Sequence, residues 1–199
     1  MKRGKYNLKK RAERQQQTRQ RILETTLELH QTLGPQQTTV TDIAKRAGVQ
    51  RQTIYNHFPD ELSLFKACSA HYRDLNPPPD PAPWTEIADP ESRLRRALAE
   101  VYAYYRHNEL MLANVTRDVQ VNENLRQVVE ARLKHWERMR NTLASAWDER
   151  DGKHRNVLVG ALSLALDFQT WRTLERQHSL DDEQAIELMV GTVRCAMGD

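Results

Sequence analysis

Apolar residues recur at helical spacing along most of the chain, and the alternation typical of strands is nearly absent. In the N-terminal third, an apolar stripe over residues 22–33 predicts one helix, which Gly34-Pro35 ends. Thr39 and Asp42 are spaced as in a capping box and predict the start of a short second helix. Gly48 separates that helix from a third, over about residues 50–58.

The remainder of the chain predicts further helices around one proline-rich connection. A fourth helix restarts at Pro59-Asp60, and six of the eight prolines then lie between residues 77 and 90, where a regular helix is not expected. Beyond them, Asp89-Pro90 supplies a cap residue and an N-terminal proline. The apolar stripes that follow predict helices over about residues 94–105, 108–115, 125–147, 154–175 and 182–196.

We therefore expect an all-α fold of nine helices, with a three-helix helix-turn-helix head and a roughly six-helix body. Residues 1–18 would form a basic N-terminal arm and residues 19–74 the helix-turn-helix domain with its connecting fourth helix. Residues 75–89 would form the proline-rich connection, and residues 90–199 the body.

Positive charge is concentrated at the N-terminal end. The chain of 199 residues holds 30 Lys and Arg against 27 Asp and Glu, a formal net charge of +3. Residues 1–60 contain twelve of these bases and five of these acids, so this part carries +7 and the remainder −4. A basic N-terminal third favours contact with a polyanion such as nucleic acid, although a solvated basic tail would give the same count.

The sequence lacks the common signatures of catalysis, metal binding and membrane insertion. It contains no GxSxG, HExxH, P-loop or GxGxxG motif, and no two histidines lie three or four residues apart. Cys68 and Cys195 are isolated, and the longest uncharged apolar stretch, residues 156–166, is far shorter than the roughly 20 residues that a bilayer requires. We expect no enzyme activity, no cofactor, no metal, no membrane contact and no export signal, and a cytoplasmic location.

Two short helices joined by a glycine-containing turn, in the most basic part of the chain, predict a helix-turn-helix that binds DNA. The small Ala44 and Ala47 permit a close helix crossing, while Ile54 and Phe58 would pin the second helix from beneath. The runs Thr38–Val49 and Thr53–Phe58 resemble the N-terminal domain of the TetR (tetracycline-repressor) family. The resemblance is specific from about Arg19 to Phe65, and beyond that it concerns only the number and length of the helices.

The TetR resemblance implies an all-α homodimer whose two heads bind a palindromic operator in double-stranded DNA. It makes the body, residues 90–199, the domain for dimerisation and for binding a small effector. By position, it places Arg51, Gln52 and Thr53 at base edges, and Tyr55, Asn56 and His57 at phosphates and some bases. Thr39 and Thr41, at the start of the second helix, would meet a phosphate.

The sequence departs from the family pattern at two positions near the head. Gln50 stands where family members often have a small cap residue, so the start of the recognition helix is less clearly specified. Glu61 stands where many carry a phosphate-binding lysine. Together with Asp60 it would favour the positive end of the fourth helix but repel a phosphate, so no DNA contact is assigned there.

The basic arm adds Lys9, Lys10, Arg11 and Arg14 to the predicted DNA-binding residues. They would follow the phosphate backbone or enter the adjacent minor groove, and the alternative is a disordered, solubilising tail.

Two further sets of residues are predicted in the body. The TetR resemblance implies that helices of the body surround an effector pocket. We expect it to be lined by aromatic residues at core spacing and by charged residues that interrupt apolar stripes: Tyr102, Tyr105, Arg132, Trp136, Asp167, Phe168 and Trp171. Core packing and internal ion pairs are the alternatives. The dimer interface would be a four-helix bundle from the last two helices of each subunit, with Leu164, Phe168, Ile186, Met189, Val190 and Val193.

The helix-turn-helix pattern predicts a sequence-specific DNA-binding regulator of transcription, and the TetR resemblance implies a repressor that a small molecule releases from DNA. Three alternatives stay open at this point: an architectural helix-turn-helix protein without an effector, a regulator that activates, and an all-α enzyme with a degenerate motif. The sequence names neither the effector, the operator nor the regulated genes.

Overall fold

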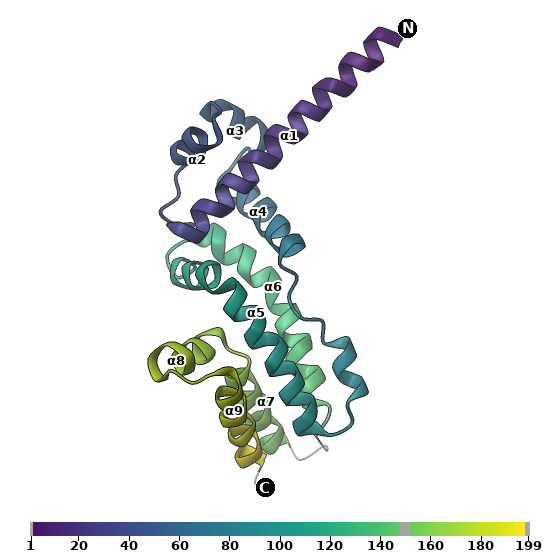
Figure 1. Cartoon of the computed structure of the whole chain (residues 1–199), viewed down its shortest axis with the longest axis vertical. Helices are drawn as coiled ribbons and strands as arrows, with labels where there is room; N and C mark the ends of the chain where they lie inside the picture. The colour runs from purple at the N-terminus through teal and green to yellow at the C-terminus, as the bar shows by residue number, and fades with distance from the viewer. Residues whose placement is uncertain (1, 148–151, 198–199) are drawn as a thin grey trace. The chain divides into compact units, whose positions relative to one another are not determined.

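The computed structural model describes the backbone of residues 2–147 and 152–197, with side chains from residues 9–147 and 154–197. Within these ranges the fold is all-α, with no strand (Figure 1). The helices in chain order are α1 (Lys2–Thr32), α2 (Val40–Ala47), α3 (Arg51–His57), α4 (Glu61–Leu75), the 3₁₀ helix η1 (Ala82–Glu86), α5 (Pro90–Asp118), α6 (Glu123–Ala144), α7 (Gly152–Ala165), α8 (Phe168–His178) and α9 (Asp182–Met197).

The chain forms two compact units, each built from two segments. Unit 1 comprises Met1–Pro77 and Leu110–Ala131, and unit 2 comprises Pro78–Glu109 and Arg132–Asp199. The sequence interpretation assigned all of residues 90–199 to one domain. The structure differs because the C-terminal turns of α5 carry Met111 and Val115 into the core of unit 1.

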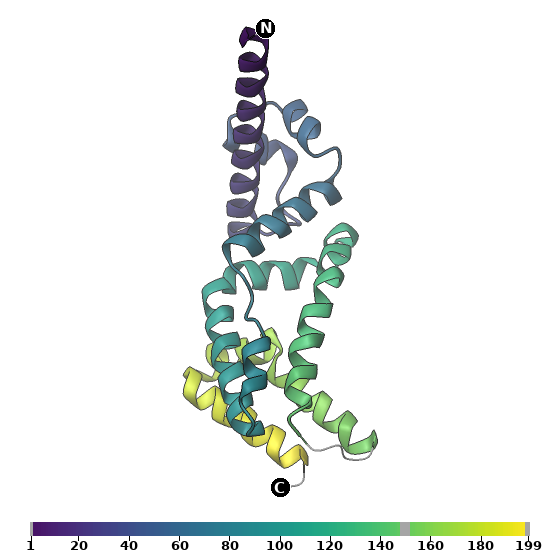
Figure 2. The ribbon, with the colours of Figure 1, turned by 90° about the vertical axis from the view of Figure 1, so that its right-hand side faces the viewer.

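Helix α1 packs against α2, α3 and α4 in unit 1. The apolar faces predicted from the sequence meet here, and Ile22, Ile43 and Ile54 are at most 1% exposed. Cys68 lies in the same core, and burial raises the pKa of its thiol to about 12. The N-terminal half of α1 projects past α2 and α3 in both views of the ribbon (Figures 1 and 2).

Local signals set the ends of the helices in the head. Thr39 and Asp42 form the expected capping box at the start of α2. Gly48 ends α2 in the left-handed conformation, with φ +64°, and its N–H donates to the last carbonyls of that helix. A second capping box, between Asp60 and Ser63, starts α4.

The C-terminal end of α1 is held by side chains from the end of α5, both within unit 1. The side-chain amide of Asn114 donates to the carbonyls of His30 (3.0 Å) and Gln31 (2.9 Å). The guanidinium of Arg117 donates to the carbonyl of Leu33 at 3.0 Å. These bonds satisfy carbonyls that have no partner within α1.

Gly34 and Asp118 lie at the tightest point of this contact. The φ of Gly34 is +97°, and a Cβ there would lie 2.5 Å from Asp118 Oδ2 and closer still to Arg117 Nη2. The buried Asp118 accepts the backbone N–H of Gln36 at 3.0 Å. Nearby, burial lowers the pKa of His30 to about 4, and the charge of Asp118 offsets part of that effect.

Unit 2 has a core of large side chains from α5 to α9. Leu98, Tyr102, Met139, Leu162 and Trp171 are completely buried, and α7 packs along α9. The proline-rich connection contributes as well, because η1 buries the indole of Trp84, whose N–H donates to Glu100 at 2.9 Å.

Two predicted helix boundaries are wrong: one expected break between helices is absent, and one break that was not expected is present. Helices were expected over residues 94–105 and 108–115, but α5 runs through both. Asn108, expected to start a new helix, lies inside α5, where its side-chain amide donates to the carbonyl of Tyr104 (2.8 Å), four residues earlier. The single helix expected over residues 154–175 is instead α7 and α8, so the described ranges still hold nine α-helices.

The break between α7 and α8 is held by groups that sequence periodicity does not reveal. The Tyr102 hydroxyl donates to the carbonyl of Ala165 at 3.0 Å, and the Tyr105 hydroxyl donates to that of Leu166. Asp167 then caps α8 by accepting the N–H of Thr170 at 2.8 Å. None of the helices in residues 2–147 and 152–197 is long and apolar enough to cross a membrane.

Candidate nucleic-acid interface

Helix α3 is anchored by apolar side chains and presents polar ones to solvent. Ile54 and Phe58 are 1% and 3% exposed. The exposed side chains of α3 are Arg51, Gln52, Tyr55 and Asn56, whereas Thr53 and His57 are half-buried. The predicted recognition residues are therefore displayed on a helix that the core of unit 1 holds in place.

The first turn of α3 lacks a side-chain cap. Gln50 is the N-cap residue and makes no capping hydrogen bond, as its identity predicts. Within the helix, Gln52 Nε2 donates to Asn56 Oδ1 at 3.2 Å. This bond orients two amides that both offer a donor and an acceptor, the groups that read adenine in the major groove.

Thr39 and Thr41 are exposed at the start of α2, where the resemblance places a phosphate. The Thr39 hydroxyl donates to Asp42 Oδ2 (2.6 Å) and accepts the N–H of Asp42 (3.1 Å). The hydroxyl and the backbone N–H of Thr39 both donate to the Asp42 carboxylate, and these two bonds lower its pKa. In this structure, then, the Thr39 hydroxyl serves as the helix cap.

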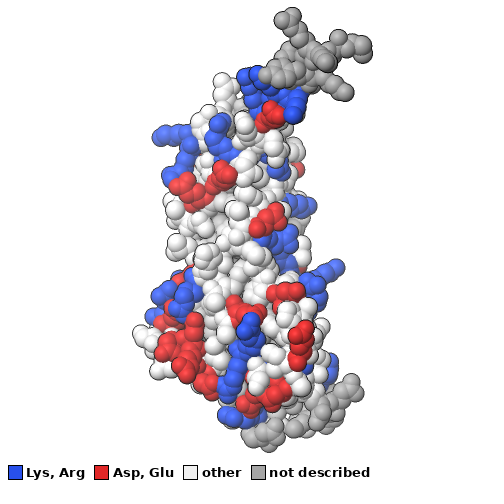
Figure 3. Space-filling model, turned by 45° about the vertical axis from the view of Figure 1, so that its right-hand side comes forward, with Lys and Arg blue, Asp and Glu red and all other residues white. Residues whose placement is uncertain are grey.

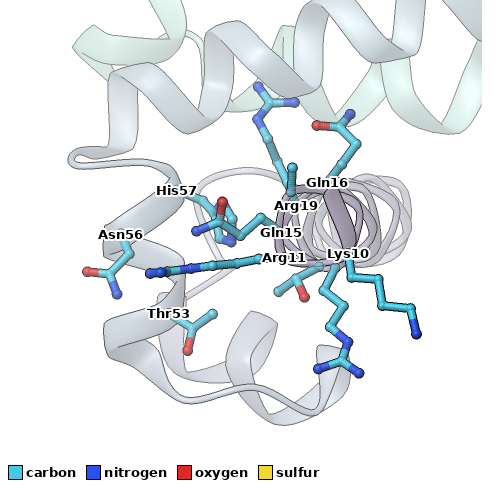
Figure 4. Close-up of a pocket in the computed structure, with 11 residues that line it drawn as sticks. Lys10, Arg11, Gln15, Gln16, Arg19, Thr53, Asn56 and His57 are labelled. Atoms are coloured by element: carbon cyan, nitrogen blue, oxygen red, sulfur yellow. The ribbon is translucent and has the colours of Figure 1, made fainter. Parts of the chain in front are cut away.

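The N-terminal half of α1 and helix α3 border a groove of about 1000 Å³. From α1 it is lined by Lys10, Arg11, Arg14 and Arg19, and from α3 by Thr53, Asn56 and His57. Figure 4 shows Arg11 extending from α1 toward the side on which Thr53 and Asn56 lie. The groove thus joins the predicted arm to the predicted recognition helix.

The predicted arm is part of a helix and not a disordered segment. Residues 2–18 continue α1 without a break. The helix separates the four basic residues predicted to bind DNA: Lys10, Arg11 and Arg14 line the groove, whereas Lys9 lies 3.9 Å from Glu13 in an ion pair.

Sequence reasoning missed Arg19, Gln15 and Thr18 as residues of this groove. The guanidinium carbon of Arg19 lies 5.0 Å from the ring centroid of Phe58, the C-cap residue of α3. This contact holds the positive charge of Arg19 beside the C-terminal end of α3. Extending the helical period back from Arg19 would have placed these residues on one face with Arg11.

The two carboxylates at the start of α4 have partners within unit 1. Asp60 accepts the N–H of Ser63 at 2.7 Å, and Glu61 accepts the side-chain amide of Asn124 at 2.6 Å. Glu61 thus has a structural contact where many family members carry a lysine.

The aromatic residues predicted for an effector pocket form one cluster in unit 2. The ring centroid of Tyr105 lies 5.4 Å from that of Phe168, 5.7 Å from Trp136 and 5.8 Å from Trp171. The rings of Tyr102 and Tyr105 also stack, 6.4 Å apart. Burial raises the pKa of both tyrosines.

The charged residues of the predicted pocket lie at other positions. Asp167 is exposed and caps α8, which explains why an acid interrupts the apolar stripe there. Arg132 is half-buried in α6. Among the described residues, the indole N–H of Trp171 and Nε of Arg140 are buried without a hydrogen-bond partner.

The residues predicted for a dimer interface divide into covered and exposed ones. Most are covered within the single chain. Phe168 is buried at the start of α8, and Met189, Val190 and Val193 are buried on α9, which packs against α7. Ile186 is half-buried and Leu164 is 57% exposed. The structure therefore differs from the expectation that the whole stripe faces a partner, and it adds Val157 and Leu188 as exposed apolar residues of α7 and α9.

The head matches known proteins in sequence. The family model for bacterial regulatory proteins of the tetR family matches residues 22–68. The HTH-type transcriptional regulator AcrR of Shigella flexneri is 48% identical over 50 residues, which are 25% of this chain and 23% of that protein. The regulator TtgW of Pseudomonas putida is 36% identical over 75 residues, 36% of this chain and 56% of that protein. The chain therefore matches these relatives over a quarter to about half of their lengths.

Solved structures match almost the whole chain in fold. NalD, the secondary repressor of the MexAB-OprM multidrug efflux pump in Pseudomonas aeruginosa, has a TM-score of 0.63 and 21% identity, covering 92% of this chain and 97% of that one. A transcriptional regulator from Saccharomonospora viridis, solved in complex with choline, has a TM-score of 0.59 and 18% identity, covering 90% and 96%. At these identities the match shows the shared fold alone. Residues 22–68 therefore match the family of tetR bacterial regulatory proteins in sequence, and the chain shares its all-α fold with NalD.

Proposed function

We propose that this chain is a homodimeric transcriptional repressor that binds a palindromic operator and leaves it when a small molecule binds unit 2. The observation that carries the proposal is the exposed polar face of α3, held on the core of unit 1 by Ile54 and Phe58. A helix of this kind inserts into the major groove, where side-chain amides and guanidinium groups read base edges.

Within the head, base reading falls to Arg51, Gln52 and Thr53 at the start of α3. Tyr55, Asn56 and His57, in its last turns, contact phosphates and some bases. Thr41 and the first amides of α2 meet a further phosphate.

A dimer is supported by the apolar residues that α7 and α9 leave exposed. Val157, Leu164 and Leu188 are 47%, 57% and 46% exposed in the single chain. Pairing these two helices with their copies in a second subunit would cover them in a four-helix bundle. Two heads related by a twofold axis then require an operator with matching half-sites.

An effector site in unit 2 is supported by the aromatic cluster around Tyr105 and by two polar groups buried without partners, on Trp171 and Arg140. Buried donors of this kind are costly unless something accepts from them. The choline-bound relative shows that this fold accommodates a small molecule. The ligand would shift the population toward a form whose two heads no longer fit successive major grooves of the operator. This regulation would take place in the cytoplasm, where the DNA lies.

The experiment is selection of duplexes from a random-sequence library, followed by gel shifts in the presence of metabolite and drug pools. We expect enrichment of a palindrome and its release by at least one pool. Gln52→Ala should change the enriched sequence, whereas Gln177→Ala, which replaces an exposed glutamine on α8, should not. Failure to enrich any sequence would refute specific DNA binding, and a shift that no pool reverses would favour an architectural protein.

A further inference from the structure

Helix α1 continues far beyond the part that packs on the head. Residues 9–17 are all exposed, and burial begins at residues 18–20. At 1.5 Å per residue, the segment from Lys2 to Gln17 is about 24 Å long. Because the side chains of residues 9–17 are not buried, this part of α1 gains little from packing, so its position beside α3 matters for what its side chains can reach.

The two sides of this helical segment differ in charge. One face of the helix lines the groove toward α3, and it carries residues at positions i, i+3, i+4 and i+7: Arg11, Arg14, Gln15 and Thr18. Lys9 and Glu13 lie on the opposite side and pair with each other. None of the eleven described residues that line the groove is acidic. In Figure 3, Lys and Arg side chains gather where α1 leaves the rest of unit 1.

The other wall of the groove belongs to the recognition helix. Asn56 and His57 of α3 line it, and Arg19 closes its base with a guanidinium held over Phe58. When a recognition helix occupies the major groove, a phosphate backbone passes on each side of it. One of these backbones would pass on the side of α3 that faces α1.

We propose that the groove between α1 and α3 holds the sugar-phosphate backbone of one DNA strand, with Arg11 and Arg14 contacting its phosphates from the side of α1. This inference rests on the proposed function. The helical form of the segment decides between the two modes open to an arm: a helix about 10 Å or more across does not fit a minor groove about 6 Å wide. The segment lies along the backbone, and α1 and α3 clamp the strand between them.

Single-charge variants of α1 test the clamp, on the duplex that the unaltered full-length protein enriches from a random-sequence library. Arg11→Ala and Arg14→Ala each remove one groove charge, and Arg11→Gln removes the charge while keeping a long polar side chain. Lys9→Ala is the matched control, because it removes one charge from the same helix on the side away from the groove. Circular dichroism confirms that each variant keeps its helix content.

The measurement is the slope of log affinity against log salt. Each arginine variant should flatten that slope by about 0.9 for each bound subunit, since one phosphate contact releases about that many counterions. Lys9→Ala should leave the slope unchanged. The loss should be equal on duplexes with A·T-rich and G·C-rich flanks, because the backbone carries the same charge in both.

Three results would overturn the inference. Equal slopes for Arg11→Ala, Lys9→Ala and the unaltered protein would show that the groove meets no phosphate, while the proposed function would stand. A loss confined to A·T-rich flanks would show that the segment unwinds into the minor groove. A protein that enriches no duplex would overturn the proposed function as well.

Discussion

Replacing Gly34 with alanine should destabilise unit 1 by about 3 kcal/mol, for two reasons that can be measured separately. The first is the backbone, because a φ of +97° is open to glycine and costs a residue with a Cβ about 1 kcal/mol. The second is the lack of space, because the new Cβ would lie 2.5 Å from Asp118 Oδ2. Displacing that buried carboxylate weakens its bond to the N–H of Gln36, a charged hydrogen bond of about 2 kcal/mol.

Gly48→Ala is the control, because φ is +64° there and no atom lies within 4 Å of the added Cβ. It should cost only the backbone part, about 1 kcal/mol. Urea unfolding followed by far-ultraviolet circular dichroism gives both values. Moreover, Arg117→Ala should reduce the cost of Gly34→Ala, because Arg117 Nη2 is the other atom in the way. Equal losses for the two glycine variants would refute the steric part of this reasoning.

Further predictions concern the head, the subunit contact and the response to pH. Tyr55→Phe should weaken binding to all duplexes alike in a salt titration, since its hydroxyl is assigned to phosphate; a change in sequence preference would contradict that role. Leu164→Glu should leave the fold intact, because the side chain is 57% exposed, and should give monomers in sedimentation. An undisturbed dimer would refute the assignment of Leu164 to the dimer interface. Burial lowers the pKa of His30 from the ordinary 6.5 to about 4 in the folded chain. Its contribution to stability is therefore complete above pH 6.5 and falls by roughly 3 kcal/mol toward pH 4. His30→Asn should remove this part of the slope, and an unchanged pH profile of unfolding would count against it.

The head could be predicted because its structure depends on local signals. The Thr39–Asp42 capping box and the left-handed Gly48 are readable within a few residues, and the period of Ile43, Ala44 and Ala47 sets the buried face. The exposed face of α3 follows by elimination, so most of the candidate DNA-binding residues could be named from the sequence.

The remaining features depend on contacts between distant residues or on the absence of an apolar pattern. The break between α7 and α8 is held by the hydroxyls of Tyr102 and Tyr105, more than 60 residues earlier in the chain. The basic segment of α1 has no apolar stripe, so periodicity could not identify it as a helix; it extends a helix that the core of the head has already nucleated. An apolar stripe also does not reveal whether it is buried within its own chain or against a partner. On α9, Val190 and Val193 are buried within the single chain.

The burial of Cys68 gives the head an internal reporter of its own opening. Because burial raises the pKa of its thiol to about 12, Cys68 is almost wholly protonated at neutral pH, and its sulfur is shielded by the core. An alkylating reagent should therefore modify Cys68 only while unit 1 is transiently open. The rate at which Cys68 is labelled, measured by mass spectrometry of its peptide, reads out how often the head opens in the unaltered protein.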